Sequence, residues 1–498
     1  MRALDTSHPG SAPRAAPEWA AVADLDIVGV TADSRAVVPG DLFAALPGTR
    51  VDGRTFIAEA VARGAVAVLA PPGTAWPAGV PRRPVIMDAE PRQALARIAA
   101  VLAGPQPHTV VAVTGTNGKT SSVEFIRQLW ASAGEKAASL GTLGLIAPGF
   151  EPGPGLTTPD PVSLAETLAG LARHGVRKAA MEASSHGLDQ FRLDGVRLAA
   201  AAFTNLTRDH LDYHGTIQAY RDAKLRLFRD LLPEGAPAVA DADMDPDTLD
   251  ALRAVARDRK LDLRTVGEAG AAIRLIAATP RPDGQILTLE AGGARRDVAL
   301  ALPGRFQADN VLVAAAVTEA LGLADALDRI GGLSGVRGRM ELAARLPNGA
   351  AAYVDYAHTP DALERLLSAL RPHTHGRLHV VFGAGGDRDR GKRPLMGAAA
   401  ARLADACIVT DDNPRTEAPE TIRAAVLAAC PGAREIGDRA QAIAAALNDL
   451  RSGDVLVVAG KGHEQGQTIG TTVHPFDDAA VIRGLVGGAE PGASRGAA

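Results

Sequence analysis

A strand, a glycine-rich turn and a helix follow one another in residues 109–130, and this succession constrains the fold more than any other feature. The β-branched run TVVAVT predicts a buried strand, and SSVEFIRQLW after the turn predicts an amphipathic helix. Backbone N–H groups of such a turn, at a helix N-terminus, bind phosphate. Lys119 would reach the β and γ phosphates, and Thr120 offers a hydroxyl to Mg²⁺. We therefore expect a nucleoside triphosphate with magnesium to bind here.

The match to the usual phosphate loop is imperfect. The spacing G-x-x-x-x-G-K-[ST] would place a glycine at Val113, whereas the earlier glycine is Gly115. The alternative is a strand–turn–helix connection that contains Gly-Lys-Thr by chance and binds no phosphate. The strand before the loop and the helix after it, together with TGTNGKT, disfavour this alternative. The loop alone does not separate switches, kinases and ligases, because all of these share it.

Apolar strands alternate with helical stretches over most of the 498 residues, which predicts an α/β protein of three domains. A first domain is expected at 1–105. The stretch AGPQPH predicts a linker around Gly104 to His108, at the end of this domain. A central domain with a parallel sheet covered by helices is expected at 106–336. In 337–498, LHVVFGAGG, ACIVTDDNP and DVLVVAGKG are strands ending in Gly- or Asp-rich loops, which predicts an open, Rossmann-like α/β sheet.

Composition excludes several classes of protein. The net charge of −4 argues against a nonspecific nucleic-acid binder, which needs a basic surface. The two cysteines, Cys407 and Cys430, lie in apolar contexts and are expected to be small core residues in a reducing compartment. No apolar run approaches the ~20 residues that span a bilayer, and the first 20 residues lack the apolar region of a secretory signal. We therefore expect a cytoplasmic protein without membrane insertion.

Carboxylates and histidines follow two apolar runs downstream of the loop. Glu182 ends the run before SSHGLDQ, where a carboxylate is a natural Mg²⁺ ligand. The second run leads into TNLTRDHLDYHGT, which contains His210. Glu182 therefore predicts a magnesium ligand beside the phosphate loop.

Lys224 belongs to a chain in which only seven of 53 basic residues are lysines. On a helix, Tyr220, Lys224 and Phe228 share one face, so the lysine is expected to be partly buried. Burial favours a neutral amine, which reacts with CO₂ to give a carbamate. The alternative is that Lys224 pairs with Asp222 or Asp230, or extends to solvent.

The motifs together resemble the Mur ligases of peptidoglycan synthesis, and most closely those that add 2,6-diaminopimelate. The resemblance runs from about residue 31 to 465 and rests on TGTNGKTS, TTPDP, EASSHGLDQ, FTNLTRDHLDYHG, DYAHTPDALE, GAGGDRDRGKR, DDNPR and GKGHE. It implies an ATP-dependent amide-bond ligase with a UDP-sugar-binding N-terminal domain, a central ATPase domain and a C-terminal amino-acid-binding domain. It also implies a carbamylated Lys224 (N6-carboxylysine) that supports the magnesium site.

The resemblance assigns roles to residues that match the family's motifs. ATP-binding positions are Gly115, Thr116, Asn117, Gly118, Lys119, Thr120, Ser121, Asn310, Arg339 and Asp355. Catalytic or magnesium-binding positions are Lys119, Thr120, Glu182, His210 and Lys224. Positions for the UDP-sugar peptide are Ser34, Thr49, Arg50, Val51, Thr157, Thr158, Ser184, Gln190 and Arg192. Positions for diaminopimelate are Arg388, Asp412, Asn413, Pro414, Arg415, Gly460 and Glu464.

The resemblance implies that meso-diaminopimelate joins the D-glutamate γ-carboxylate of UDP-N-acetylmuramoyl-L-alanyl-D-glutamate through an acyl phosphate. An arginine fork binds carboxylates in two-point contacts, and Arg415 would meet the carboxylate that distinguishes diaminopimelate from lysine. The same ligase type using L-lysine, another Mur or folylpolyglutamate-type ligase, and a phosphate-loop switch protein are the alternatives. We expect a monomer.

One position departs from the family's pattern. The family shows an asparagine after Gly-x-Phe before the helix of Asn310, and this chain has Gln307 in GRFQADN. The longer side chain is expected to alter the fit near the adenine.

Overall fold

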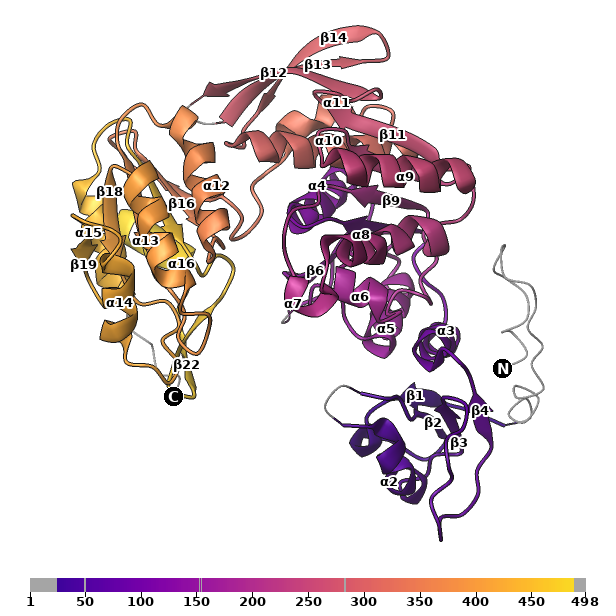
Figure 1. The fold of residues 1–498 in the computed structure, drawn as a ribbon. Helices are drawn as coiled ribbons and strands as arrows, with labels where there is room; N and C mark the ends of the chain where they lie inside the picture. The colour runs from indigo at the N-terminus through magenta and orange to yellow at the C-terminus, as the bar shows by residue number, and fades with distance from the viewer. Residues whose placement is uncertain (1–24, 49–50, 152, 154, 282–283, 488–498) are drawn as a thin grey trace. The chain divides into compact units, whose positions relative to one another are not determined.

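The computed structural model describes residues 25–48, 51–151, 153, 155–281 and 284–487. It contains three larger sheets and one two-stranded hairpin, and each larger sheet is accompanied by helices (Figure 1). The chain forms two compact units, Met1–Arg274 with Asn310–Leu327 and Leu275–Asp309 with Asp328–Ala498. Each unit is described by itself. The predicted α/β fold class is confirmed.

The N-terminal part of the first unit is a small parallel sheet with the order β1-β2-β3-β4. Its strands and two longer helices are β1 (Gly29–Thr31), β2 (Asp41–Ala44), β3 (Ala67–Ala70), β4 (Val85–Met87), α2 (Ile57–Ala62) and α3 (Pro91–Ala103). Strands β2 and β3 are buried along their whole length, which explains their uninterrupted apolar sequence. Helix α3 packs against helix α5 (Pro161–Arg173), and Gly104 to His108 link it to the next strand, as predicted.

The central sheet carries the predicted strand–turn–helix succession as β5 (Thr109–Thr114) and α4 (Lys119–Ser132). Within the first unit its order is β11-β10-β9-β5-β8-β6-β7, parallel except for β7. The other strands are β6 (Ala137–Gly141), β7 (Gly144–Ile146), β8 (Lys178–Glu182), β9 (Ala200–Phe203), β10 (Pro237–Asp241) and β11 (Asp262–Gly267). The remaining helices between these strands are α6 (Ser185–Asp189), α7 (Leu211–His214), α8 (Ile217–Arg226) and α9 (Pro246–Asp258). Because β5 lies between β8 and β9, the carboxyl ends of three strands meet at the phosphate loop.

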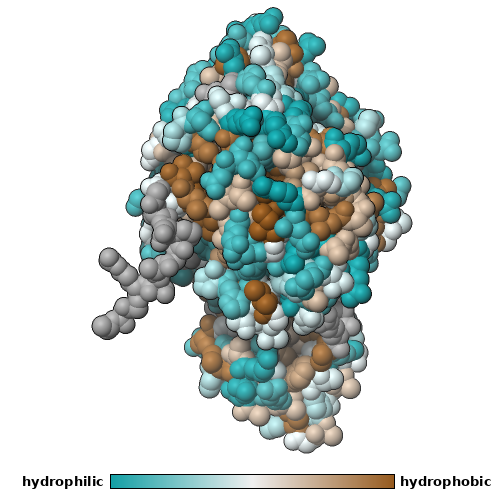
Figure 2. Space-filling model, turned by 90° about the vertical axis from the view of Figure 1, so that its left-hand side faces the viewer, coloured by the Kyte–Doolittle hydropathy of each residue, from teal (hydrophilic) through white to brown (hydrophobic). Residues whose placement is uncertain are grey.

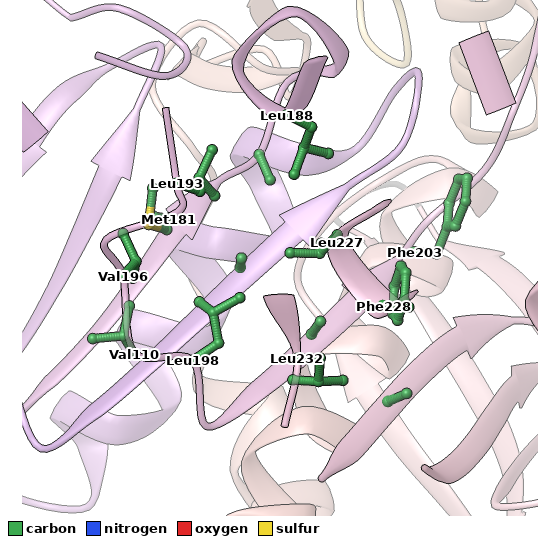
Figure 3. Close-up of a cluster of buried hydrophobic side chains, with 14 of the residues drawn as sticks. Val110, Met181, Leu188, Leu193, Val196, Leu198, Phe203, Leu227, Phe228 and Leu232 are labelled. Atoms are coloured by element: carbon green, nitrogen blue, oxygen red, sulfur yellow. The ribbon is translucent and has the colours of Figure 1, made fainter. Parts of the chain in front are cut away.

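The core beneath this edge is apolar. Val110 and Met181 from neighbouring strands, Phe203 from β9 and Phe228 after α8 belong to one buried cluster (Figure 3). The Phe203 and Phe228 rings are stacked with centroids 6.0 Å apart. This packing fixes α8 against the sheet, and α8 carries Lys224.

The alternation of strands and helices is interrupted after β11. Strand β12 (Ile273–Arg281) is followed along the chain by β13 (Gly284–Ala291) and β14 (Ala294–Leu300), with no helix among the described residues between them, and the last two form an antiparallel hairpin. The purely parallel, helix-covered sheet predicted up to about residue 335 is therefore wrong in this stretch. Gly292 and Gly293, both with positive φ, make the tight turn that an antiparallel connection needs. Helices α10 (Arg305–Ala320) and α11 (Ala326–Arg329) follow.

The second unit holds a sheet with the order β15-β16-β20-β17-β18-β19, parallel except for β15. Its strands are β15 (Glu341–Arg345), β16 (Ala351–Asp355), β17 (Leu378–Phe382), β18 (Ala406–Val409), β19 (Arg434–Glu435) and β20 (Val455–Ala459). Its helices are α12 (Pro360–Leu370), α13 (Lys392–Leu403), α14 (Pro419–Leu427), α15 (Arg439–Asp449) and α16 (Asp478–Val486). A hairpin of β21 (Gly466–Ile469) and β22 (Thr472–Pro475) follows β20. The three strands predicted in this region are confirmed.

Hydrophobic residues lie in small groups between hydrophilic ones on the face shown in Figure 2. Among the described residues, no helix has both the length and the apolar character needed to cross a membrane. Cys430 is a buried core residue, as predicted, whereas Cys407 is half-buried beside the same core.

Candidate active site

The phosphate loop lies between β5 and α4, and its glycines fit very closely against neighbouring residues. Gly115 and Gly118 have φ values of 144° and 85°. A β-carbon at Gly115 would overlap the Thr204 hydroxyl, and one at Gly118 would overlap the Asn310 amide. Both positions therefore require glycine. Asn310, expected on the ATP side, thus lies directly against the loop.

Lys119 begins α4 and turns back over the loop. Its Nζ donates to the carbonyl oxygens of Gly115 and Thr116, each at 2.9 Å. The loop is further held from β9, because the Asn205 side chain accepts the N–H of Asn117 at 3.0 Å. The predicted cation is therefore next to the loop backbone, where a phosphate group would bind.

Glu182 ends β8 beside the loop and is almost fully buried. Its carboxylate accepts the Thr120 hydroxyl at 3.0 Å and the Thr142 N–H at 2.8 Å. Gly141 leaves room for it, because a β-carbon there would overlap Oε1. The structure thus brings Glu182 and Thr120 together, and it adds Thr142, which sequence reasoning missed. A carboxylate and a hydroxyl are the hard oxygen ligands that Mg²⁺ prefers.

Among the described residues, no three His, Cys, Asp or Glu side chains form a group that could hold a metal ion. A magnesium ion at Thr120 and Glu182 would therefore need further ligands, such as phosphate oxygens and water. Mg²⁺ commonly binds proteins in this way, through one or two carboxylates plus substrate phosphates. The two side chains present fit such an ion.

Lys224 is 1% exposed, which confirms and exceeds the predicted burial. Its Nζ donates to the Gly115 carbonyl at 2.8 Å and lies 4.5 Å from the centre of the Tyr220 ring. Burial lowers the pKa of the Lys224 ammonium well below its usual range, and the charge of Lys119 adds to this effect. The alternative pairing is wrong for Asp230, whose carboxylate contacts Arg226 and Arg229 instead.

His210 is exposed and adopts a left-handed backbone conformation with φ of 51°, immediately before α7. Its ring contacts Tyr220, with centroids 6.1 Å apart, and His186, with centroids 4.9 Å apart. His210 and Lys224 therefore border the same tyrosine. A non-glycine residue held at positive φ is costly, and such residues gather at functional sites.

The residues expected to bind the substrate peptide surround Glu182. The Thr157 hydroxyl lies 3.1 Å from that of Thr142. Thr158 donates to the Glu182 carbonyl at 3.0 Å and accepts the Ser184 N–H at 3.0 Å. The Arg192 guanidinium donates to the Gln190 side chain and to the Thr158 carbonyl, each at 2.7 Å. Arg192 therefore connects Gln190 to this group.

The residues expected to hold the UDP end lie in the N-terminal sheet region. Ser34 is buried and donates to Glu59 Oε2 at 2.8 Å, and Val51 is exposed. Thr49 and Arg50 lie outside the described residues. The Ser34 side chain thus hydrogen-bonds to Glu59 rather than to the group around Glu182.

Arg339 and Asp355 belong to the second unit, whereas Asn310 belongs to the first. Asp355 accepts the N–H groups of Met340 and Ala357 at 2.7 and 2.9 Å, and Arg339 lies over the Tyr356 ring at 4.8 Å. Burial raises the pKa of Asp355, and the charge of Arg339 opposes that shift.

Gln307, the residue that departs from the family's pattern, is fully buried in the second unit. Its amide reaches the Arg339 carbonyl at 3.5 Å. The longer side chain therefore contacts the backbone of a residue expected on the nucleotide side.

The seven residues expected to bind diaminopimelate meet where β17, β18 and β20 end. Arg415 has φ of 52°, and its guanidinium donates to the Gly386 carbonyl at 2.8 Å. Arg415 and Arg388 both approach Gly385. The set comprises Arg388, Asp412, Asn413, Pro414, Arg415, Gly460 and Glu464.

The acidic side of this pocket is held by contacts of Asn413 and Gly460. Asn413 donates to Glu464 Oε2 at 3.0 Å. A β-carbon at Gly460 would lie 2.6 Å from Asp412 Oδ2, so glycine allows this carboxylate to approach. Arginines on one side and carboxylates on the other suit a ligand that carries both ammonium and carboxylate groups.

Sequence reasoning missed the hairpin that holds this pocket. The side chain of Gln467 donates to the Asp412 carbonyl at 2.8 Å, and the backbone of Thr468 pairs with Asn413 and Arg415. The alternating sequence QTIGTTVHP, with a glycine at its centre, could have indicated two short strands and a turn.

The phosphate loop on a parallel sheet, with a buried acid and lysine beside it, defines a nucleotide-binding α/β protein. The Mur ligase middle domain matches residues 113–318, the Mur ligase glutamate ligase domain residues 338–462, and the Mur ligase family catalytic domain residues 26–102.

Similar proteins cover almost the whole chain. A relative from Caulobacter vibrioides, named UDP-N-acetylmuramoyl-L-alanyl-D-glutamate–2,6-diaminopimelate ligase, is 56% identical over 92% of this chain and 95% of its own. One of the same name from Rhizobium meliloti is 53% identical over 94% and 95%. A solved structure of a ligase of that name has a TM-score of 0.72 with 34% identity and covers 98% of both chains. The chain belongs to the Mur ligase family.

Proposed function

We propose that this protein is an ATP-dependent ligase that joins meso-2,6-diaminopimelate to the D-glutamate γ-carboxylate of UDP-N-acetylmuramoyl-L-alanyl-D-glutamate. The observation that carries the proposal is the name shared by relatives 47–56% identical over more than nine-tenths of the chain. The likeness to a MurF ligase from Thermotoga maritima, at 20% identity and a TM-score of 0.58, supports the fold alone.

The arrangement of the phosphate loop suits activation of a carboxylate. The γ-carboxylate would attack the ATP γ-phosphate to give an acyl phosphate and ADP. Negative charge develops on the phosphoryl oxygens, and Lys119 with the loop N–H groups would stabilise it. Thr120 and Glu182 would hold a magnesium ion, which when bound supplies positive charge that reduces repulsion between the two anionic reactants.

Lys224 would contribute as a carbamate. Its neutral amine, buried beside the loop, would add CO₂ and lose a proton, giving an anion on a long side chain. His210, which borders the same tyrosine, is its proposed partner at a second magnesium site. This role of Lys224 rests mainly on the family resemblance.

The second half-reaction needs an amine next to the acyl phosphate. The amino group of diaminopimelate would attack the acyl carbon, and phosphate would leave. We propose that Thr157, Thr158, Ser184, Gln190 and Arg192 bind the peptide part of the UDP-linked substrate, and that Ser34 and the 49–51 loop bind its UDP end. Because acyl phosphates hydrolyse, the site is expected to exclude water during the reaction.

The three proposed domains are residues 1–105 for the UDP-sugar, 106–336 for ATP and 337–498 for the amino acid. Each of the three larger sheets falls within one of these ranges. We further propose a monomer that works in the cytoplasm, where its nucleotide-linked substrates would be found.

The choice of diaminopimelate over L-lysine would depend on Arg415. Replacing Arg415 with alanine removes the guanidinium that would bind the distal carboxylate, so KM for diaminopimelate should rise roughly 10- to 100-fold. The KM values for ATP and for the UDP-linked substrate should change less than about twofold, because these sites use other residues. Steady-state kinetics with each substrate varied in turn test this. An unchanged KM for diaminopimelate would show that the assignment of the pocket is wrong.

A further inference from the structure

A fully buried lysine lies beneath the proposed amino-acid pocket, and no role has yet been assigned to it. Lys461 follows β20 and is 0% exposed. Its Nζ donates to Asn413 Oδ1 at 2.9 Å and to the Gly466 carbonyl at 2.7 Å. It therefore connects the loop after β18, the loop after β20 and the start of the β21–β22 hairpin.

Lys461 fixes the orientation of the Asn413 amide. Asn413 Oδ1 accepts from Lys461 and also from the Thr468 N–H at 2.9 Å. The amide nitrogen is thereby directed to Glu464 Oε2, at 3.0 Å. A cation cannot accept a hydrogen bond, so the flipped amide would place two donors against each other.

Lys461 also sets the charge of the pocket. Its Nζ lies 3.6 Å from Glu464 Oε2 and 3.9 Å from Asp412 Oδ1. On this acidic side of the pocket, opposite Arg388 and Arg415, the two carboxylates and the Lys461 ammonium leave a single net negative charge. The nearby Arg439 and Asp478 form a fully buried ion pair of their own, with Nε and Oδ1 2.7 Å apart, and do not change this sum.

Packing alone does not explain a charged group at this position. Burial lowers the pKa of Lys461, because desolvation of a charged ammonium is costly. An apolar side chain of similar volume fills such a space without that cost.

We propose that Lys461 is a positioning residue for the amino-acid substrate. Its ammonium fixes the Asn413 amide and offsets one of the two carboxylates on the acidic side of the pocket, which leaves one net negative charge on that side for an ammonium group of the incoming amino acid. The inference rests on the proposed function and deepens it, because Lys461 touches Asn413, Asp412 and Glu464 rather than the reacting atoms.

The test compares Lys461→Met with the wild-type protein in the ligation assay, with each substrate varied in turn. KM for diaminopimelate should rise roughly 10- to 100-fold, which corresponds to the loss of a hydrogen bond to a charged group. KM for ATP and for the UDP-linked substrate should stay within about twofold. If Lys461→Met does not fold, Lys461→Gln, which keeps a donor but no charge, is measured by the same criterion.

Two controls separate positioning from a general loss of stability. Leu447→Ala removes a buried side chain on α15, in a core cluster that contains none of the residues assigned to the pocket, and should leave all three KM values within about twofold. In an Asn413→Ala background, the effect of Lys461→Met should shrink to less than about threefold, because the two residues act together.

The outcomes distinguish the inference from the proposed function. No product with the wild-type protein would overturn the proposed function and this inference with it. Product with the wild-type protein, but an unchanged KM for diaminopimelate in the Lys461 variant, would overturn only the inference. An equal rise of the KM for diaminopimelate in the Leu447→Ala variant would also overturn only the inference.

Discussion

Lysine is scarce in this chain, and two of its seven lysines have side chains almost completely removed from solvent. Lys224 donates to the Gly115 carbonyl of the phosphate loop, and Lys461 donates to a side chain of the amino-acid pocket. Arginine, which stays protonated and has a wide planar head, could not replace either. The scarcity singled out Lys224 in the sequence, whereas the contacts of Lys461 needed the structure.

Carbamylation of Lys224 has a direct spectroscopic test. The wild-type protein in ¹³C-labelled bicarbonate should show a carbamate ¹³C resonance that is absent from Lys224→Met. Activity of that variant should fall by roughly 10²- to 10³-fold, as when one electrostatic contributor to a transition state is removed. Lys260→Met, which alters an exposed lysine paired with Glu234 at 2.7 Å, should keep both the resonance and the activity. A resonance that persists in Lys224→Met would assign the carbamate elsewhere.

Gly141 gives a second test, of the position of Glu182. Alanine at this position would overlap Glu182 Oε1 and displace the carboxylate from Thr120. We expect kcat to fall roughly 10- to 100-fold, because small displacements at a reacting centre are costly. The Mg²⁺ concentration at half-maximal activity should also rise.

The matched control is Gly332→Ala, where an added β-carbon meets nothing within 4 Å. Its kcat should equal that of the wild-type protein in the same assay. A Gly141→Ala enzyme with unaltered kcat would mean that the Glu182 carboxylate is not needed where the structure has it.

Helix α8 is held in place by a buried ion pair as well as by its apolar face. Arg226 Nη2 lies 2.5 Å from Asp194 Oδ1, and the Gln93 side chain on α3 donates to the same oxygen at 2.7 Å. The pair therefore connects the helix that carries Lys224 to a helix of the N-terminal region.

Asp194→Asn should destabilise the protein by about 3–5 kcal/mol, because it leaves the Arg226 charge buried without its partner. Asp230→Asn, which removes an exposed partner of the same arginine, should cost less than about 1 kcal/mol. Chemical denaturation of both variants measures the difference. If both variants lose the same free energy of unfolding, burial of the Arg226–Asp194 pair has no energetic consequence.

The strand–turn–helix elements were predictable because their signals are local. The β-branched run, the glycines and Lys119 are consecutive, so the sequence predicted β5, the loop and α4 together. The β13–β14 hairpin was missed, because β14 is mostly exposed and both strands have a mixed composition without a long apolar run.

Contacts between distant residues could not be read from the sequence. Thr142 and Glu182 are 40 residues apart, and Lys461 and Asn413 are 48 apart. No local pattern encodes such pairs, because they depend on which strands become neighbours. The family resemblance supplied most of the candidate residues, whereas the partners that orient them came from the fold.

Across the whole molecule, the phosphate loop lies in one compact unit and the proposed amino-acid pocket in the other. The proposed reaction needs both, because ATP activates the acid and the pocket selects the amine. Ligation should therefore fail if either unit is inactivated. Hydrolysis of ATP should depend on the presence of the amino acid.

Mass analysis of the product after incubation with ATP, Mg²⁺, the UDP-linked muramoyl dipeptide and either diaminopimelate or L-lysine examines this proposal most directly. We predict a product whose mass exceeds that of the dipeptide substrate by one diaminopimelate residue, formed with an equal amount of ADP. With L-lysine we predict little or no product. A chain that hydrolyses ATP but never lengthens the peptide, or that prefers L-lysine, would contradict the proposed function.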